Sequence, residues 1–351
     1  MLTRILEAVT APIRASGRLR RPVRRIIAVV AGPNPSFDYY LARRLAEPDA
    51  PPVSVVDVAS PGVSRDENLE GAFLIFCRYI SRKWLNCLEA EREKLAGVGL
   101  FLDDDMDALA ADRSVPFMYR LDIYRRALWH RPRFNRQLDF LWVANGRLAR
   151  RYRSADPAVL PPFPDEPDGA RPSVPVDRLR MAFHSQSVHR GEHLWLRSIM
   201  PRILEMEPGI ALEVIVDRPL TGLWRGLPRT QVLAALPWPE FRAHTASAGA
   251  DLLLAPTLPS PVNAMRSATK RIDAYRLGAA LLVSSPEIYE PSAEERSLGM
   301  CVPPERQAWI DAVTGLARDP ERLLRLRDLN RKVVAVMMAS EGRLPISPSR
   351  L

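Results

Sequence analysis

The sequence predicts an α/β protein in which two halves each form a parallel β-sheet flanked by helices. Short apolar segments of strand length alternate with helical segments, and this alternation is typical of parallel sheets with crossover connections. It is interrupted by the Pro-rich, acidic segment at residues 161–175, which has no apolar period and is typical of a linker. The length of 351 residues also fits two domains, because single hydrophobic cores stop growing at about 250–300 residues.

The elements of the first half follow one another in a regular order. Residues 26–31 are the first clear apolar strand. Further strands are expected at residues 53–58, 72–77, 99–102 and 138–143, and helices are expected before Leu45, at 81–95 and at 146–152. Strands that alternate with helices in this way are expected to pair in parallel.

The second half begins a new series of strands and helices at Leu179. Strands are expected at residues 179–184, 211–217 and 251–255 and again before Ser285, and helices are expected to end near Met206 and at Gly278 and to start at Asp319. Gly is the usual residue just past the end of a helix, and Pro320 fits a first helical turn. Two such halves place a ligand cleft between them, outside the carboxyl ends of the strands.

Two segments lie outside the predicted domains, which we place at residues 26–165 and 166–340. Residues 1–25 combine an apolar helical stripe with a run of arginines, a pattern typical of a helix lying in a membrane interface. A short helix packed on the protein, with its arginines in solvent, fits the same pattern. Residues 341–351 are expected to form a flexible tail.

The bulk composition excludes several classes of protein. With 47% hydrophobic and 26% charged residues the chain is globular, and no apolar run approaches the ~20 residues of a membrane-spanning helix. No secretion signal is recognisable, and three cysteines without metal-type spacing fit a reducing cytosol. The net charge of +9 comes almost entirely from arginine, yet no nucleic-acid-binding module is recognisable, so no nucleic-acid partner is expected. Neither a G-x-G-x-x-G nor a G-K-S/T motif occurs.

Residues 250–285 carry the most informative pattern. An apolar strand ends in Ala-Pro, a Pro-rich loop follows, and a helix runs to Gly278 before another apolar strand. Ser267, Lys270 and Asp273 recur at a spacing of three and are therefore expected along one side of that helix. A cation, a hydroxyl and a carboxylate at a loop-to-helix junction could hold a diphosphate and a ribose, because free backbone N–H groups and the helix dipole favour an anion.

This segment resembles the donor-binding domain of glycosyltransferases with the GT-B fold, which take a sugar from a nucleotide-diphosphate sugar. Their C-terminal domain carries the same order of strand, Ala-Pro, loop, helix, Gly and strand. Lys270, Asp273 and Gly278 match a pattern found in several bacterial members, and the order of elements from Leu179 extends the resemblance over roughly 150 residues. Met265 stands where common retaining members carry a Glu, so retention and inversion both stay open.

The resemblance implies two Rossmann-like domains that face each other across a cleft, with the donor mainly on the second domain and the acceptor on the first. In the family the Lys neutralises the departing diphosphate and the acidic residue accepts hydrogen bonds from ribose hydroxyls. The candidate donor-binding residues are Ser185, Asn263, Ser267, Lys270 and Asp273. The candidate catalytic residues are Lys270, Arg190, His189 and Asp104. Asp104 belongs to a triplet of aspartates that could instead cap a helix or hold a divalent cation.

Two alternatives remain from the sequence. His189 to His193 reads HRGEH, which fits the H-x-x-E-H pattern of an inverted zinc protease, although Gly191 weakens a helix at its centre. A protein with the GT-B fold but no catalysis, acting as a binding or scaffolding subunit, fits the absence of an acid at Met265.

We therefore predict a bacterial glycosyltransferase of polysaccharide biosynthesis, hexosyl- or related, that requires no metal and no cofactor. Its partners would be a nucleotide sugar and a glycan, lipid-linked or small-molecule acceptor. It is expected in the cytoplasm, with residues 1–25 offering peripheral association with an anionic membrane at its inner face.

Overall fold

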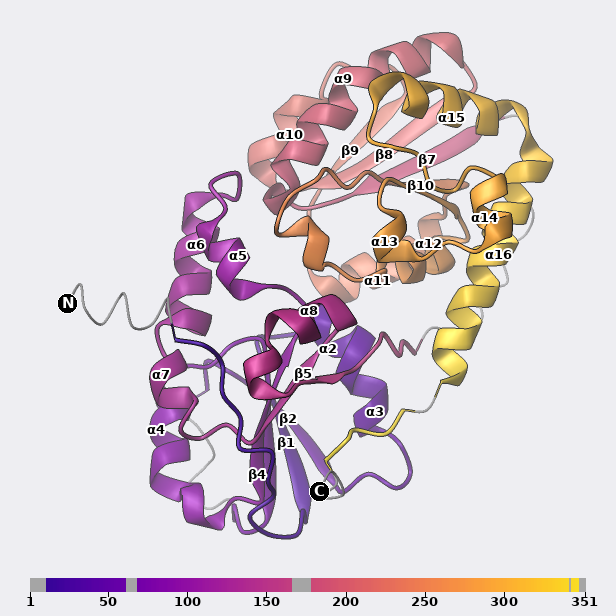
Figure 1. The fold of residues 1–351 in the computed structure, drawn as a ribbon. Helices are drawn as coiled ribbons and strands as arrows, with labels where there is room; N and C mark the ends of the chain where they lie inside the picture. The colour runs from indigo at the N-terminus through magenta and orange to yellow at the C-terminus, as the bar shows by residue number, and fades with distance from the viewer. Residues whose placement is uncertain (1–10, 61–67, 166–177, 341, 347–351) are drawn as a thin grey trace.

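The computed structural model describes residues 11–60, 68–165, 178–340 and 342–346, and it has the predicted α/β architecture. Two parallel sheets, each flanked by helices, form two halves, drawn from indigo to magenta and from pink to yellow in Figure 1. The residues between the two sheets include the predicted linker, most of which lies outside the described residues.

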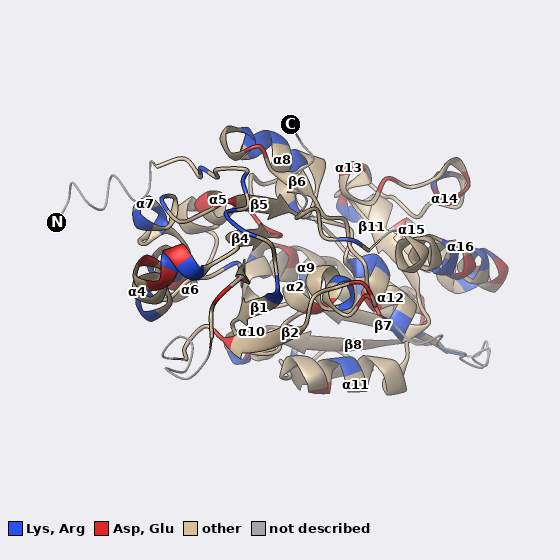
Figure 2. Ribbon diagram, turned by 90° about the horizontal axis from the view of Figure 1, so that it is seen from below, with Lys and Arg blue, Asp and Glu red and all other residues tan. Residues whose placement is uncertain are grey.

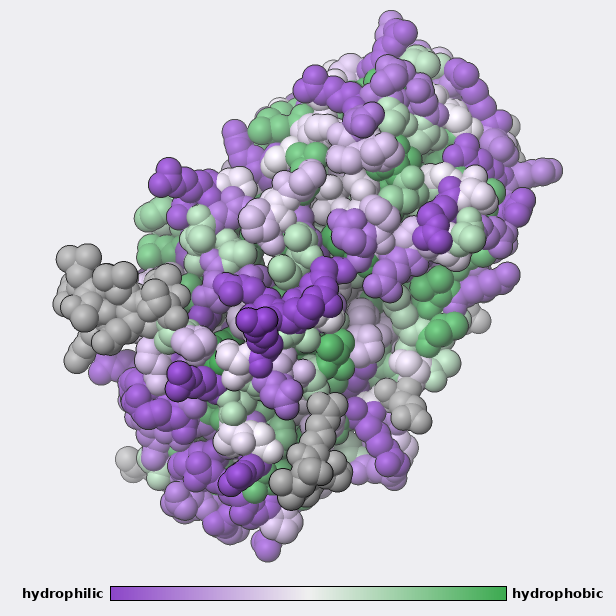
Figure 3. All heavy atoms as spheres, viewed as in Figure 1, coloured by the Kyte–Doolittle hydropathy of each residue, from purple (hydrophilic) through white to green (hydrophobic). Residues whose placement is uncertain are grey.

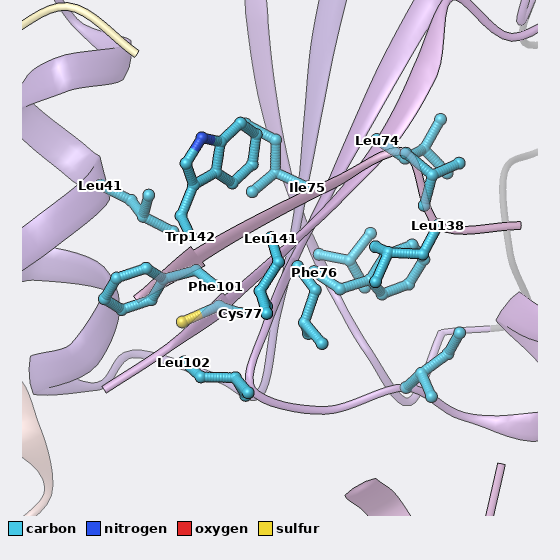
Figure 4. Packing of buried hydrophobic residues seen from close by; sticks show 14 of the residues in the cluster. Leu41, Leu74, Ile75, Phe76, Cys77, Phe101, Leu102, Leu138, Leu141 and Trp142 are labelled. Atoms are coloured by element: carbon cyan, nitrogen blue, oxygen red, sulfur yellow. The ribbon is translucent and has the colours of Figure 1, made fainter. Parts of the chain in front are cut away.

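The first sheet has six parallel strands in the order β2-β1-β3-β4-β5-β6. The strands are β1 (Arg25–Val30), β2 (Val53–Asp57), β3 (Ala72–Cys77), β4 (Gly97–Leu102), β5 (Phe140–Val143) and β6 (Ala158–Val159). The strands β3 and β4 are buried along their whole length, which explains their continuous apolar sequences. Figure 4 shows Phe101 and Trp142 on one face of this sheet and Phe76 on the other, all of them within the buried core. Gly99 is required there, because a Cβ atom would lie 2.2 Å from the Trp142 ring.

The second sheet has five parallel strands in the order β11-β10-β7-β8-β9. The strands are β7 (Leu179–His184), β8 (Ile210–Val216), β9 (Thr230–Ala234), β10 (Leu252–Ala255) and β11 (Ala280–Val283). In each sheet the chain first builds outward in one direction and then returns to add strands on the other side. This reversal lies between β1 and β3 in the first sheet and between β7 and β10 in the second. Ligands of doubly wound sheets bind at such switch points.

Helices cover both sheets, and the helices predicted within the two domains are present. In the first half they are α2 (Pro35–Phe37), the π-helical turn η1 (Asp38–Ala42), α3 (Arg43–Leu45), α4 (Arg82–Glu91), η2 (Arg92–Lys94), α5 (Met106–Ala111), α6 (Phe117–Ile123), η3 (Tyr124–Leu128), α7 (Arg131–Phe134), α8 (Gly146–Arg151) and η4 (Arg153–Ala155). In the second half they are η5 (Ser187–His189), α9 (Arg190–Met206), α10 (Arg218–Trp224), α11 (Trp238–Ala248), η6 (Asn263–Met265), α12 (Lys270–Leu277), α13 (Pro286–Tyr289), α14 (Ala293–Ser297), α15 (Arg306–Arg318) and α16 (Pro320–Ala339).

The N-terminal segment differs from its prediction where the structure describes it. Residues 11–24 contain no helix and run along the first half, where the backbone of Ser16, Arg20 and Arg24 donates to carbonyls of the domain. Ile13, the last residue of the predicted apolar stripe, is buried against the first half although the chain around it is not helical. Residues 1–10 lie outside the described residues, and membrane association stays a prediction. Among the described residues, no helix combines the length and the apolarity that crossing a bilayer requires.

The last long helix connects the two halves. Helix α16 packs on α12 and β11 of the second half, and Figure 1 shows it, in yellow, running down toward the first half. Met337 near its end packs against the core of the first half. Leu344 and Ile346, which belong to the segment predicted as a flexible tail, also pack there.

Candidate functional site

A cleft with a volume of about 470 Å³ lies between the two halves, at the carboxyl ends of both sets of strands. The loops at both switch points line it, after β1 and β3 on one side and after β7 and β10 on the other. Polar and charged residues of the lining include Ser36, Tyr39, Arg78, Asp103, Asp104, His184, Ser185, His189, Arg266, Ser267, Lys270 and Asp273. The predicted cleft between the domains is therefore present.

Helix α12 carries the candidate donor site, and its ends explain its position. Thr269 precedes it, and Gly278 ends it with φ of 67°, a left-handed conformation that Gly adopts without strain. Ser267 lies just before the helix instead of on its side, but it still lines the cleft. Every residue of α12 after Lys270 is buried, because α11 and α16 pack against the helix.

A buried ion pair joins α12 to α14. Both Arg271 and Glu295 are 1% exposed, and two hydrogen bonds of 2.7 and 3.2 Å join them. Breaking such a pair leaves an uncompensated buried charge. We therefore expect Glu295→Gln to lower the free energy of unfolding by about 3–5 kcal/mol, measured by urea denaturation.

Glu294 provides the matched control for Glu295→Gln, because it is the neighbouring residue and its ion pair with Arg325 is exposed. Glu294→Gln should change the unfolding free energy by less than about 1 kcal/mol. Burial would raise the pKa of Glu295, but hydrogen bonds from Arg271 and Ser292 lower it below its usual value. Its contribution is therefore present at neutral pH and decreases as the pH falls through the acid range. Equal decreases in the free energy of unfolding of Glu295→Gln and Glu294→Gln would contradict the expected importance of the buried ion pair.

Lys270 is held at the edge of the cleft with part of its hydrogen-bonding capacity unused. Its ammonium group donates to the carbonyl of His184 at 2.9 Å and to Oδ2 of Asp273 at 2.9 Å. An ammonium has three donors, so these bonds leave one for a ligand. The side chain of Lys270 is 31% exposed, which makes it accessible from the cleft. The cation is thus both fixed in place and available.

Asp273 is a buried carboxylate with three donors around it. It accepts hydrogen bonds from Lys270, from the hydroxyl of Tyr39 and from Arg276. Burial alone would raise its pKa, but the charges of Lys270 and Arg276 outweigh that effect and lower the pKa to about 2. The carboxylate is therefore ionised at neutral pH, and its contacts are lost only as the pH falls toward 2. A ribose hydroxyl would meet a carboxylate that Tyr39 already contacts.

The opposite wall of the cleft presents a cluster of charges from the first half. Arg78 donates to Asp104 at 3.2 Å and lies 3.4 Å from Asp103, and Ser36 donates to Asp103 at 2.6 Å. Burial, and secondarily the charge of Asp104, raise the pKa of Asp103 despite the nearby guanidinium. Arg266 of the second half approaches Oδ1 of Asp104 at 3.9 Å. The candidate Asp104 therefore faces the candidate donor site across the cleft.

The sequence did not identify Arg78, Arg266 or Tyr39 as site residues. Arg78 follows β3 directly and has φ of 68°, an uncommon backbone conformation for a non-glycine residue that is concentrated at functional sites. Its place at the carboxyl end of a strand beside the switch point was a usable signal. Nothing in the sequence indicated that Arg266 and Tyr39 would meet residues of the other half.

The structure brings some predicted residues into the cleft and leaves others outside it. Ser185, His189, Ser267, Lys270, Asp273 and Asp104 line the cleft. Arg190 is exposed at the start of α9 and Asn263 is buried, and neither lines it. The amide of Asn263 donates to Glu192 at 2.6 Å and to the carbonyl of Leu258 at 2.7 Å, and these bonds hold the loop before α12 in place.

The geometry of the HRGEH segment argues against a zinc hydrolase. His193 is fully buried, and Nδ1 accepts a hydrogen bond from Trp224 at 3.0 Å. Nε2 must then carry the proton, which it donates to the carbonyl of Ser185 at 3.1 Å. Both ring nitrogens are occupied, and burial lowers the pKa of His193 to about 4. Within the described residues, no three His, Cys, Asp or Glu side chains are placed to hold a metal ion.

Hydrogen bonds between the two halves hold the loop that precedes α12. The amide of Asn145, the N-cap of α8, donates to the carbonyl of Met265 at 2.8 Å and to the hydroxyl of Ser267 at 2.9 Å. Arg147 donates to the carbonyl of Arg266 at 2.7 Å. Figure 3 shows hydrophilic side chains gathered over α8 at this junction. Lys and Arg are otherwise spread over helices of both halves (Figure 2), which does not suggest one basic groove for nucleic acid.

Solved structures with the same fold share little sequence with this chain. The pneumococcal O-GlcNAc transferase GtfA, in complex with UDP and GlcNAc, is 11% identical with a TM-score of 0.51, over 77% of this chain and 55% of that one. A Thermobaculum terrenum O-GlcNAc transferase variant is 15% identical with a TM-score of 0.50, over 94% and 67%. S. aureus TarM, in complex with UDP, is 7% identical with a TM-score of 0.52, over 77% and 53%.

These likenesses establish the fold of the chain. Two Rossmann-like domains with facing switch points are the GT-B arrangement, as the sequence predicted. The aligned region spans about half the length of GtfA and TarM. No protein-family model matches the sequence, and no curated protein is detectably similar to it.

Proposed function

We propose that this protein is a glycosyltransferase that uses a nucleotide-diphosphate sugar as donor. The observation that carries the proposal is Lys270, a fixed cation with a spare donor at the start of α12 in the interdomain cleft. A helix N-terminus and an ammonium group together favour a diphosphate. The GtfA and TarM structures, which share the fold, both contain UDP, and this supports the same class of ligand here.

The two walls of the cleft suit the two substrates of such a transfer. On the wall formed by the second half, Lys270, Ser185 and Ser267 would hold the diphosphate and stabilise the charge that develops as it leaves. On the opposite wall, Asp104 would bind the acceptor hydroxyl, a group of a glycan, a lipid-linked or a small-molecule acceptor. The acceptor oxygen attacks the anomeric carbon, the bond to the phosphate oxygen breaks, and the nucleoside diphosphate leaves. The acceptor proton passes to Asp104 in an inverting transfer or to the departing phosphate oxygen in a retaining one. We expect the transferred group to be a hexosyl or related sugar.

Nucleotide binding tests the proposal directly. Calorimetric titration with UDP, GDP and ADP should reveal saturable binding of at least one of these nucleotides. Slow hydrolysis of the corresponding nucleotide sugar should be detectable without acceptor. A folded protein that binds none of the three and hydrolyses no nucleotide sugar would instead be a scaffold with the GT-B fold.

We propose that the reaction requires no metal and no cofactor. Lys270 and Arg266, two of the cations that line the cleft, would supply the positive charge that a divalent ion supplies elsewhere. We therefore expect nucleotide affinity and sugar-nucleotide hydrolysis to change less than about twofold in excess EDTA. Loss of turnover in EDTA, with recovery on addition of Mg²⁺ or Mn²⁺, would contradict this expectation. Stoichiometric zinc in the purified protein would instead support the alternative hypothesis of a zinc hydrolase that uses the HRGEH segment.

A further inference from the structure

The hydroxyl group of Tyr39 lies in a socket formed by Asp273 and Arg276 of α12. It donates to Oδ1 of Asp273 and accepts from Nη2 of Arg276 at 2.6 Å. Tyr39 belongs to the first half and the socket to the second, so the contact joins the two domains. All three side chains are buried, and burial followed by the charge of Asp273 raises the pKa of Tyr39 well above its usual value. The phenol therefore remains a neutral donor.

Further contacts between the domains hold Tyr39 in this socket. The neighbouring Asp38 accepts from Nε1 of Trp238 at 2.7 Å and from Arg242 at 3.1 Å. The Tyr39 ring packs edge-on against Trp238, with ring centroids 5.3 Å apart. The Arg276 guanidinium lies 5.7 Å from the Tyr39 ring centroid and 5.5 Å from that of Trp238. Tyr39 lies in the π-helical turn η1, and such turns are frequent at functional sites.

The socket has the chemistry that recognises an aliphatic hydroxyl as well as a phenol. A carboxylate accepts the hydroxyl proton, and a guanidinium donates to the hydroxyl oxygen. Oδ2 of the same carboxylate lies 2.9 Å from the Lys270 ammonium. A ligand whose diphosphate contacts Lys270 would therefore carry its ribose close to the socket.

We propose that Tyr39 is an internal ligand of the Asp273–Arg276 socket: its hydroxyl occupies the socket while no donor is bound and is displaced by the ribose hydroxyl that Asp273 is expected to bind. The identity of the ligand rests on the proposed function, whereas the occupied socket is a feature of the structure. Donor binding exchanges one hydroxyl for another and makes no covalent bond. The exchange also removes one of the contacts that hold the two domains together, so donor binding is coupled to movement of η1.

Removing the Tyr39 hydroxyl tests the competition. Tyr39→Phe keeps the ring and its packing on Trp238, so the socket is left without its internal ligand. One net hydrogen bond corresponds to an affinity change of about two- to tenfold. We expect Tyr39→Phe to bind UDP, GDP or ADP, whichever the wild type binds, about two- to tenfold more tightly. The 2′,3′-dideoxy form of the same nucleotide, which has no ribose hydroxyls, should gain nothing.

A second variant weakens the contacts that hold Tyr39 in the socket without removing its hydroxyl group. Asp38→Asn weakens the ion pair with Arg242 while it leaves the Tyr39 hydroxyl in place, and it should tighten ribonucleotide binding in the same direction. Tyr124→Phe is the matched control, because it removes a phenol hydroxyl outside the cleft lining. Its affinity for the same nucleotide should equal that of the wild type. Thermal unfolding of each variant confirms that the folded protein is being titrated.

The outcomes separate this proposal from the proposed function. The proposal that Tyr39 competes with the donor is wrong if Tyr39→Phe binds the ribonucleotide no more tightly than the wild type, or if the dideoxy form gains equally. Either result leaves the proposed glycosyltransferase function unaffected. Binding of no nucleotide by the wild type and by both variants removes the proposed function and the socket together. A gain limited to the ribonucleotide, shared by Asp38→Asn and absent from Tyr124→Phe, supports the socket.

Discussion

Lys270→Met is expected to weaken binding of the donor nucleotide about 10- to 150-fold, the range that corresponds to loss of one charged hydrogen bond. Methionine keeps much of the length and apolar bulk of the lysine stem but carries no ammonium. The variant also loses the cation that stabilises the leaving diphosphate, and removal of one such group typically costs about 10²–10³ in turnover. Calorimetry with UDP, GDP and ADP measures the first effect, and release of the nucleoside diphosphate measures the second.

The lysine variant needs a control, because Lys270 also partners Asp273. Lys83→Met removes an exposed lysine of α4 and should leave nucleotide affinity unchanged. A second comparison uses Lys270→Arg, which keeps the charge and should recover part of the affinity. If Lys270→Met binds nucleotide as the wild type does, the ammonium serves only to pair the buried Asp273, and the donor site lies elsewhere.

The fold was predictable because its signals are local and repeated. Nine of the eleven strands were predicted from short apolar segments. The strand β6 (Ala158–Val159) is too short to produce a pattern of its own, and β9 (Thr230–Ala234) was not predicted. Helices α5, α6 and α7 were also missed, since none exceeds seven residues and none has a long apolar stripe. In the N-terminal segment only Ile13 of the apolar stripe belongs to the described residues. Residues 11–24 form no helix and instead donate backbone hydrogen bonds to the first domain.

The site was predictable only in part, because it depends on how two distant segments meet. Lys270 and Asp273 could be found from a strand-loop-helix pattern within one half. Their partner Tyr39 lies more than 200 residues away, and no local pattern marks it. The orientation of Asn263 could not be predicted for a related reason, since residue type does not reveal which way a loop side chain turns. Its amide points to Glu192 and not into the cleft.

Asp104→Asn is expected to slow transfer to the acceptor by about 10²–10⁴-fold, the usual contribution of a positioned general base. Nucleotide affinity should change less than about twofold, because the residue lies on the wall opposite Lys270. Asp104 suits the role of base better than its neighbour Asp103. In Asp103, Oδ2 accepts a hydrogen bond from the Ser36 hydroxyl and Oδ1 is buried, so neither oxygen is open to an acceptor. The measurement is the rate of glycosyl transfer at saturating donor, with Asp328→Asn, an exposed residue of α16, as the control.

The Asp104 variant also bears on the stereochemistry that Met265 leaves open. An inverting transfer needs a base to take the acceptor proton, so its rate should fall in Asp104→Asn while the product stays inverted. A retaining transfer needs no dedicated base, and its rate should then be nearly that of the wild type. NMR of the anomeric proton in the product distinguishes the two outcomes. Retention together with an unchanged rate would remove Asp104 from the chemistry and leave its ion pair with Arg78 as its role.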